Sequence, residues 1–369
     1  MKKGKRNILK IILLSLAFVL VFLISTLYMP FIRKSKNVNT EFEYVFKDVI
    51  PSMDTKIVDI AMLGAHDAFS SDIKFSSKPN KNEEGISNNK LVNAIAKGLC
   101  VRMSKAQIAS AKEMLYAGVR YFDVRVTKIG DTYYTYHGYL SNKLEVYVKD
   151  VVEFLSSHPG EFIIFDIQYF YTEEGACGNL GKEVYQELFD YLDTLGLMQY
   201  VVGDTSKDIN TLTYGDLTSQ GTRAGVLMMT KSWSFDTVYY RDKDASYEKM
   251  HYESTFSYWH EKNKTSEMLK SINELNSYIE ENNTLKQYLR INQAQKTGFI
   301  MSGAIVRSLF GWSLINMANN FNKVLVSDEA RFKEWLVNMP IFMVDYVTSN
   351  KGDFNKLANK YIMEFNKNL

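Results

Sequence analysis

Short apolar runs alternate with amphipathic stretches along most of the chain after residue 55. Runs of Val, Ile, Leu and Phe are typical of buried strands, whereas apolar side chains spaced three and four residues apart are typical of helices. On this basis buried strands are predicted at residues 57–63, 118–126, 162–170, 224–230, 298–303 and 341–347, with a hairpin partner at 132–139. Helices are predicted at residues 91–116, 144–157, 181–195, 266–289 and 354–366.

This alternation of buried strands and helices predicts an α/β fold with a parallel sheet, and a (β/α) barrel of the TIM type fits the length of the body. A doubly wound open sheet is the alternative. Residues 56–369 contain no Pro- or Gly-rich linker, so they are expected to form one domain after a polar linker at 33–55. Residues 70–90 are rich in Ser, Asn and Lys and are expected to form an exposed loop.

Residues 11–32 form the most apolar segment of the chain. As a helix rising ~1.5 Å per residue this segment spans roughly 33 Å, which is enough to cross a bilayer core. It is longer than a secretory signal core, and no clean small-x-small cleavage site follows it, so an uncleaved transmembrane signal anchor is predicted. Basic residues before the span predict a cytoplasmic segment at 1–10 and a body that is attached to the cell membrane on its extracellular side. A cleaved signal peptide, giving a secreted protein, is the alternative.

Basic residues are concentrated at the N-terminal end of the chain. Residues 1–36 hold eight of the 44 Lys and Arg and no acid, which leaves 36 basic against 42 acidic side chains elsewhere. A mildly acidic body argues against nucleic-acid binding, and 46% hydrophobic residues are typical of a globular domain. The two cysteines, Cys100 and Cys177, exclude a disulfide-rich scaffold, and the sequence leaves open whether they pair.

Side chains suited to acid–base chemistry stand near the ends of predicted strands. They are His66 and Asp67 after the first strand, Asp123 and Arg125 in the second, His137 at the end of its hairpin partner and Asp345 in the last. The carboxyl ends of parallel strands meet on one face, so these groups are expected to converge there. One His can take a proton from a nucleophile, another can give one to a leaving group, and an Arg can neutralise a phosphate.

Each of these residues also has a structural interpretation when it is taken alone. A single His near a strand end is usually a satisfied core or rim residue, and an Asp and an Arg two positions apart often form a simple salt bridge. The other three histidines, His158, His251 and His260, lie in a helix-stopping turn and a polar, aromatic-rich stretch, and are interpreted as structural.

Five short motifs surround the candidate residues. They read GAHDAF at 64–69, GVRYFDVRV at 118–126, YHGYL at 136–140, FLSSHPGEFIIFDI at 154–167 and VDYV at 344–347. In this order they resemble the catalytic X domain of the phosphatidylinositol-specific phospholipase C family in its bacterial form. The resemblance extends over nearly all of the body and implies an irregular (β/α) barrel, in agreement with the strand and helix pattern.

The resemblance also implies a role for each residue. His66 would be the general base that removes the proton from the inositol 2-hydroxyl, and Asp345 would hold its tautomer and stabilise its cation. Arg125 would bind the phosphate oxygens, and His137, supported by Asp67, would protonate the diacylglycerol leaving oxygen. The implied reaction is an intramolecular phosphoryl transfer that releases diacylglycerol and gives inositol 1,2-cyclic phosphate.

Eukaryotic members place an acidic calcium ligand where this chain has Arg125, and a guanidinium there supplies the positive charge and repels a cation. No metal and no cofactor are therefore expected. Gln168 stands where bacterial members carry a headgroup-contacting Lys. Arg125, Gln168 and Lys231 are expected to bind the substrate, with Asp123 as structural support.

The implied partner is a phospholipid or glycolipid at a membrane, without nucleic acid or a protein partner. Another glycerophospho- or glycolipid headgroup stays open, because Gln168 is neutral. A glycerophosphodiester phosphodiesterase shares the barrel, but this chain lacks the His-Arg-Gly start and the Glu cluster of that family. A headgroup-binding protein with weak catalysis is a further alternative, against which the presence of both histidines, the Arg and both carboxylates argues.

Overall fold

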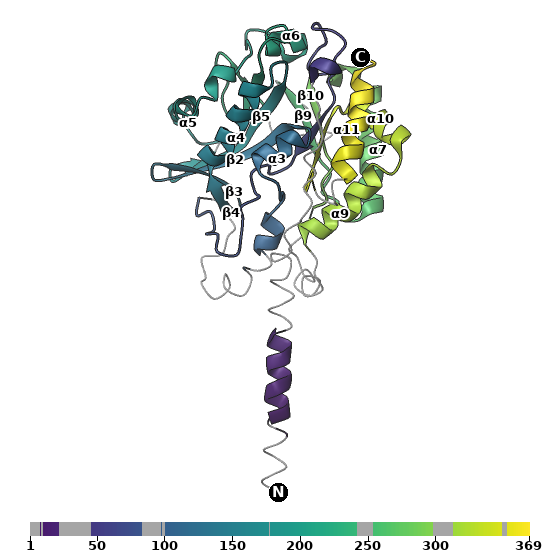
Figure 1. Cartoon of the computed structure of the whole chain (residues 1–369). Coiled ribbons are helices and arrows are strands. Elements are labelled where there is room, and N and C mark those ends of the chain that lie inside the picture. The colour runs from purple at the N-terminus through teal and green to yellow at the C-terminus, as the bar shows by residue number, and fades with distance from the viewer. Residues whose placement is uncertain are drawn as a thin grey trace.

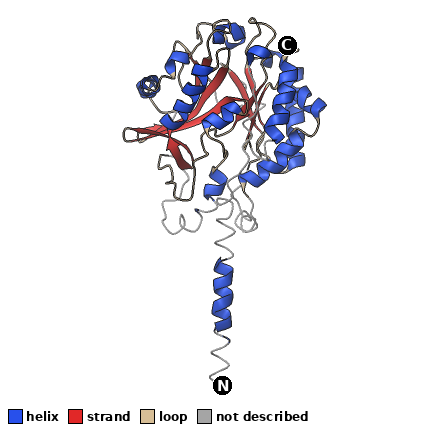
Figure 2. Ribbon diagram, in the orientation of Figure 1, coloured by secondary structure: helices blue, strands red, loops and turns tan. Residues whose placement is uncertain are grey.

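A computed structural model of the chain describes residues 8, 10–21, 46–82, 97, 100–176, 178–241, 254–297, 313–348 and 353–369. In the body, the strands lie at the centre and most helices lie around them (Figures 1 and 2). Helices α4 and α5 lie beside β2 and β5, whereas α7, α10 and α11 lie on the opposite side of the body (Figure 1).

The described strands form one curled sheet whose main path is β8-β7-β5-β2-β1-β11-β10-β9, with every neighbouring pair parallel. Their bounds are β1 Met62–Ala65, β2 Val119–Ile129, β5 Phe162–Thr172, β7 Gly225–Thr230, β8 Val238–Tyr240, β9 Thr255–Trp259, β10 Leu289–Gln293 and β11 Ile341–Val344. Strands β3 Thr132–His137, β4 Tyr139–Lys143 and β6 Gly175–Ala176 add antiparallel pairs at the carboxyl ends of the inner strands β2 and β5.

The strands follow one another in chain order around the curl, as they do in a (β/α) barrel. Strands β8 and β9 stand at the two ends of the path and do not pair with each other in the described residues. The sheet is therefore barrel-like and open along one seam. This confirms the predicted parallel α/β fold, and a doubly wound sheet, which reverses its strand order at the centre, does not describe it.

The described helices are α3 Ala111–Tyr116, α4 Leu144–Ser157, α5 Lys182–Thr194, α6 Tyr214–Thr218, α7 Thr265–Glu281, α9 Leu314–Leu325, α10 Glu329–Asn338 and α11 Asp353–Asn366. Short 3₁₀ turns lie at η1 Phe46–Asp48, η2 Met198–Tyr200, η3 Ile209–Thr211 and η4 Asn283–Gln287. Helix α4 shows why these segments are helical, because its buried side chains recur three and four residues apart and it ends just before Pro159.

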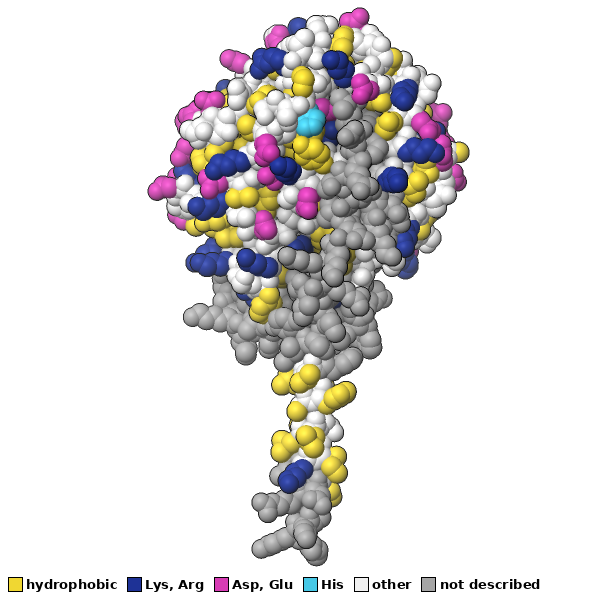
Figure 3. All heavy atoms as spheres, viewed as in Figure 1, with side chains coloured by type: hydrophobic (Ala, Val, Ile, Leu, Met, Phe, Trp, Pro, Cys, Tyr) yellow, Lys and Arg dark blue, Asp and Glu magenta, His cyan; other side chains and the backbone are white. Residues whose placement is uncertain are grey.

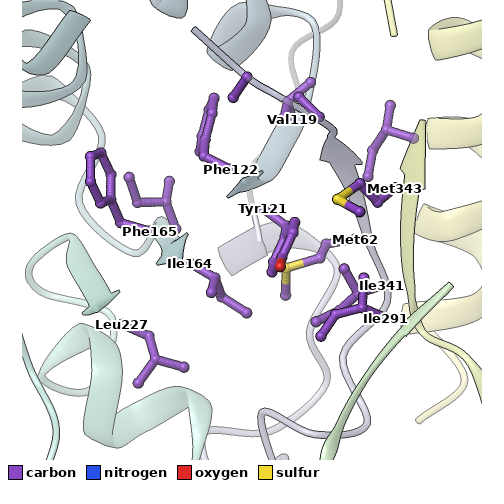
Figure 4. Packing of buried hydrophobic residues seen from close by; sticks show 14 of the residues in the cluster. Met62, Val119, Tyr121, Phe122, Ile164, Phe165, Leu227, Ile291, Ile341 and Met343 are labelled. Carbon is purple, nitrogen blue, oxygen red and sulfur yellow. The ribbon is translucent and has the colours of Figure 1, made fainter. Parts of the chain in front are cut away.

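The core fills the inside of the curl and the space between the sheet and the helices. Met62, Tyr121, Ile164 and Ile341 come from neighbouring strands and lie close together within the curl (Figure 4). Gly64 permits this packing, because a Cβ there would stand 3.0 Å from the Tyr121 ring. The apolar layer lies below the carboxyl ends of the strands, so the polar groups above it rest on a packed base.

Several predicted elements differ from those observed. Residues 57–59 form a turn rather than the first half of a strand, because the Asp59 N–H bonds to the Lys56 carbonyl and the Ile60 N–H to the Ile57 carbonyl. Strands β9 and β10 were not predicted: β9 lies in a stretch interpreted as polar, and Leu289 was assigned to the end of a helix. The predicted helix at 91–116 breaks at 105–110, and the predicted strand at 298–303 lies outside the described residues.

Two predicted exposed segments pack on the body where they are described. Within the predicted linker, the buried Phe46 ring stacks on Phe162 at 4.8 Å between ring centres. Within the predicted loop, Leu140 donates its N–H to the Lys78 carbonyl, so residues 78–80 line up with β4. The structured body therefore begins by residue 46, ten residues before the predicted domain start.

Residues 10–21 of the N-terminal segment are helical and carry exposed apolar side chains around the helix, whereas the body surface mixes acidic and basic groups (Figure 3). Residues 22–32 of the predicted span lie outside the described residues. Among the helices that the structure describes, none combines the length and the apolarity that a bilayer crossing needs. The signal anchor stays a prediction.

Candidate active site

The carboxyl ends of β1, β2 and β11 bring the candidate residues together. His66 and Asp67 directly follow β1, and the His66 N–H donates to the Val344 carbonyl at 3.1 Å, which extends the pairing of β1 with β11. Asp345 directly follows β11, and β2 carries Asp123 and Arg125 two residues apart. Side chains two positions apart share a sheet face, so both point to the same side of β2.

His66 lies at the centre of the cluster, with its two ring nitrogens in different surroundings. Its Nδ1 lies 2.7 Å from Asp345 Oδ1, and a carboxylate there fixes the proton on Nδ1. Its Nε2 lies 3.2 Å from Arg125 Nη2 and 3.5 Å from Asp67 Oδ2. Burial opposes protonation of the ring, but the charges of Asp67, Asp345 and Asp123 outweigh it and raise the pKa of His66 to about 9.

Asp67 contacts three cationic or protonatable groups. Its Oδ2 lies 2.9 Å from His137 Nδ1, and its Oδ1 forms an ion pair with Arg125 Nε. Burial favours the neutral acid, but Arg125, His137 and His66 outweigh it and hold the pKa of Asp67 well below its usual range. Asp67 adopts a left-handed backbone with φ of 43°, which non-Gly residues do rarely and mostly where the surrounding structure enforces it.

His137 stands at the end of β3, opposite His66 across the cluster. Its Nδ1 lies 2.9 Å from both Asp67 Oδ2 and the Ser104 carbonyl oxygen. Both neighbours are acceptors, so Nδ1 carries a proton and Nε2 is the nitrogen available to a bound molecule. The ring centres of His66 and His137 are 6.1 Å apart, which leaves each Nε2 able to serve a different atom of one phosphodiester.

Arg125 is held by two carboxylates and one aromatic ring. Besides Asp67, its Nη2 lies 3.7 Å from Asp123 Oδ2, and its guanidinium carbon lies 5.0 Å from the centre of the Tyr169 ring. A bulge in β5 at Gln168 brings Tyr169 opposite Arg125 in the sheet register. The Lys231 ammonium lies 4.0 Å from the centre of the same ring.

His66, Asp67 and Asp123 have the ligand types and spacing of a metal site, with one donor atom from each within 4.8 Å of the others. The guanidinium of Arg125, however, lies among these donors, paired with Asp67 and close to Asp123. A fixed positive charge at that place repels a divalent cation and already neutralises the carboxylates. The donor set therefore fits an internal ion-pair cluster better than a metal.

The predicted substrate-binding residues occupy different depths. Lys231 is half-buried just beyond β7, and no carboxylate pairs with it in the described part of the chain. Gln168 is buried and donates to the Tyr121 hydroxyl at 3.2 Å. Its amide is thus part of a layer beneath the histidines rather than a surface contact.

That layer contains a second buried ion pair, which the sequence analysis missed. Arg241 Nε lies 2.8 Å from Asp166 Oδ2, and the Tyr121 hydroxyl donates to the same carboxylate. Burial outweighs the Arg241 charge and raises the pKa of Asp166 to about 6. In the sequence, Asp166 follows a Phe in its predicted strand, as Asp123 does in the strand before it. The two carboxylates are partners in the sheet register, so this repeated pair of residues was a usable signal for the position of Asp166.

The remaining histidines make structural contacts where they are described. His158 stacks on Phe154 at 4.1 Å between ring centres, and the buried His260 lies between Ser271 and Asn292. His251 lies outside the described residues. Cys100 is a free, half-buried thiol, whereas Cys177 also lies outside the described residues.

Comparison with known proteins supports the resemblance that the motifs indicate. No family model matches the chain. PI-PLC X domain-containing protein 2 of Mus musculus is 34% identical over 120 residues, 31% of this chain and 35% of that protein. Variant-surface-glycoprotein phospholipase C of Trypanosoma cruzi is 29% identical over 132 residues, 33% of this chain and 35% of that protein. The matched part thus spans about a third of these relatives.

Solved structures extend the likeness to the whole body. Phosphatidylinositol-specific phospholipase C from Staphylococcus aureus matches with a TM-score of 0.57, covering 89% of this chain and 97% of that chain at 14% identity. The enzyme from Listeria monocytogenes matches with a TM-score of 0.53, covering 87% and 99% at 14% identity. Identities this low show the fold alone, and together with the sequence matches they confirm the resemblance to the PI-PLC X-domain family.

Proposed function

We propose that this chain, with the sequence likeness and fold of PI-PLC X-domain proteins, is a phospholipase C that cleaves an inositol phospholipid without a metal. The observation that carries the proposal is the pair of oppositely placed histidines around Arg125. Each ring has its Nδ1 held by an acceptor, so each presents Nε2 for proton transfer, and the guanidinium lies beside one of them.

In the proposed reaction His66 Nε2 accepts the proton of the inositol 2-hydroxyl as that oxygen bonds to phosphorus. The bond from phosphorus to the diacylglycerol oxygen breaks, and His137 Nε2 donates a proton to that oxygen. The products are diacylglycerol and inositol 1,2-cyclic phosphate. The nucleophile belongs to the substrate itself, and such an intramolecular attack contributes several kcal/mol through proximity.

Arg125 supplies the positive charge that the phosphate meets. Its ion pair with Asp67 and its contact with Tyr169 hold the guanidinium in one place before substrate arrives, so it need not reorganise as charge develops in the transition state. Another lipid phosphodiester headgroup is the second candidate substrate, because Gln168, the predicted headgroup contact, is buried against Tyr121 and so does not define the headgroup.

We also propose that the N-terminal segment anchors the enzyme at the membrane with the body outside the cell. The exposed apolar side chains of residues 10–21 support an association with lipid, and the basic residues before them support the orientation. A chain beginning at residue 37 should then lose membrane attachment and keep its activity on detergent-dispersed lipid. Loss of that activity would mean that the segment does more than tether.

The proposed reaction is tested by ³¹P NMR of the full chain with detergent-dispersed phosphatidylinositol, with and without EDTA. A cyclic phosphodiester resonance that is insensitive to EDTA and lost in His137→Ala is expected. His158→Ala removes a histidine outside the cluster and should keep the resonance. Failure to cleave phosphatidylinositol or any other glycerophosphodiester and glycolipid would overturn the proposal in favour of a headgroup-binding protein.

A further inference from the structure

Gln107 lies in the connection between β1 and α3. It is far in sequence from His66 and Asp345, although it contacts the backbone beside both of them. Its side chain is fully buried. The amide nitrogen donates to the His66 carbonyl at 2.8 Å and to the Val344 carbonyl at 3.0 Å, and the amide oxygen accepts from the Val347 N–H at 3.0 Å. All three bonds go to the backbone beside the His66 and Asp345 side chains.

These bonds tie together the two chain segments that carry the pair. His66 leaves β1 and Asp345 leaves β11, and each lies next to a residue with left-handed backbone, Asp67 and Tyr346. The bond from the His66 N–H to the Val344 carbonyl is the last of the strand pairing, and beyond it no ladder bond joins the two segments in the described residues. The Gln107 amide replaces the missing ladder with one rigid bridge.

The segment around Gln107 is itself fixed to the same structures. The Ser70 hydroxyl oxygen accepts from the N–H groups of Ala106 and Gln107, and the Tyr346 N–H donates to the Ala106 carbonyl at 2.7 Å. The Ser104 carbonyl contacts His137, as described above. One short stretch of the β1–α3 connection thus contacts the backbone beside the His66–Asp345 pair and also the ring of His137.

We propose that Gln107 is a positioning residue that sets the distance between the His66 imidazole and the Asp345 carboxylate. The catalytic consequence of this proposal rests on the function proposed above. Gln107 touches no reacting atom. Its effect passes through the backbone at His66 and Val344. A structural amide elsewhere on β1 would stabilise the fold without affecting this distance.

The chain offers such an amide as a matched control. Asn366 accepts from the Ala61 N–H at 2.8 Å and donates to the Ala61 carbonyl at 2.9 Å, at the opposite end of β1. Gln107→Met and Asn366→Leu each replace a buried amide with an apolar side chain of similar size. Gln107→Asn keeps an amide but shortens the side chain by one methylene, so the amide no longer reaches its partners. It is the test variant if Gln107→Met does not fold.

The primary measurement is the titration of His66 by NMR in the full chain labelled with ¹⁵N-histidine, which does not require turnover. Asp345 contributes to the raised pKa of His66, so Gln107→Met should move that pKa toward its ordinary value. Asn366→Leu should leave it unchanged. On detergent-dispersed phosphatidylinositol, Gln107→Met should lower kcat by about tenfold or more with KM within about twofold, as loss of a transition-state arrangement does.

An unchanged His66 titration in both Gln107 variants, or an equal change in Asn366→Leu, would overturn the inference. If the wild-type chain turns over no phosphodiester, the proposed function fails, whereas the NMR titration still decides whether Gln107 positions the pair. The two failures are therefore distinguishable.

Discussion

Replacing Asp345 by Asn tests the electrostatic basis of the proposed mechanism. The His66 Nδ1–Asp345 Oδ1 distance of 2.7 Å is that of a charge-assisted hydrogen bond, which contributes about 1.5–3 kcal/mol. One pKa unit corresponds to about 1.4 kcal/mol, so loss of this bond should lower the pKa of His66 by about 1–2 units from about 9. The charges of Asp67 and Asp123 remain and prevent a larger fall.

The consequence for catalysis follows from the direction of this shift. The base form of His66 is the neutral ring, so kcat/KM should rise with pH until His66 is deprotonated, and in Asp345→Asn that rising limb should lie at lower pH. The maximal rate should fall by about 10³–10⁴-fold, because an amide no longer holds the tautomer or stabilises the imidazolium.

The assay combines histidine NMR with pH–rate profiles on detergent-dispersed phosphatidylinositol. Asp328→Asn is the control, because that residue caps α10 through the Arg331 N–H and also exchanges a carboxylate for an amide. The reasoning is refuted if the pKa of His66 in Asp345→Asn stays near 9, or if the rate stays within about threefold of wild type at every pH.

His137→Ala should lose most activity on phosphatidylinositol but much less on an analogue with a nitrophenyl leaving group, which departs without a proton; equal losses in a colorimetric assay would contradict its role as the acid. Arg125→Lys should lower activity on phosphatidylinositol about tenfold or more, because an ammonium lacks the planar fork of donors that a guanidinium offers to phosphate. EDTA titration should leave wild-type activity unchanged; a loss of activity that a divalent cation restores would show a metal enzyme. The raised pKa of His66 should contribute about 3 kcal/mol to stability below pH 6.5, lost as the pH rises through about 9, so urea unfolding of His66→Gln should lack this slope. Phe46→Ala should cost about 3–5 kcal/mol in the same unfolding assay, because this fully buried ring packs on Phe162; a cost below about 1 kcal/mol would place residue 46 outside the cooperative fold.

The strands in which apolar residues predominate were predictable, even where they carry a buried Asp, and those in which polar residues predominate were not. The prediction at 162–170 lies within β5, because nearly every residue there is apolar. Strand β10 reads LRINQ, and the buried Arg290 is satisfied by the carbonyls of Asn338 and Val58, which are distant in sequence. No local pattern reveals such partners, so this strand is not predicted from the sequence, and only its first residue, Leu289, lies in a predicted element, the helix at 266–289.

The candidate site shows the same division. Short motifs identified His66, Arg125 and Asp345 as residues that converge, since side chains at the carboxyl ends of parallel strands meet on one face. Gln107 carried no such signal. It stands in a stretch whose spacing predicted helix, and its importance arises from two strand ends that meet only in the folded chain.

A single carboxylate, Asp67, lies beside both histidines and the arginine. When the substrate gives a proton to His66, positive charge beside Asp67 increases. When His137 gives a proton to the product, positive charge beside the same carboxylate decreases. The local charge stays nearly constant through the transfer, so the surroundings need little rearrangement.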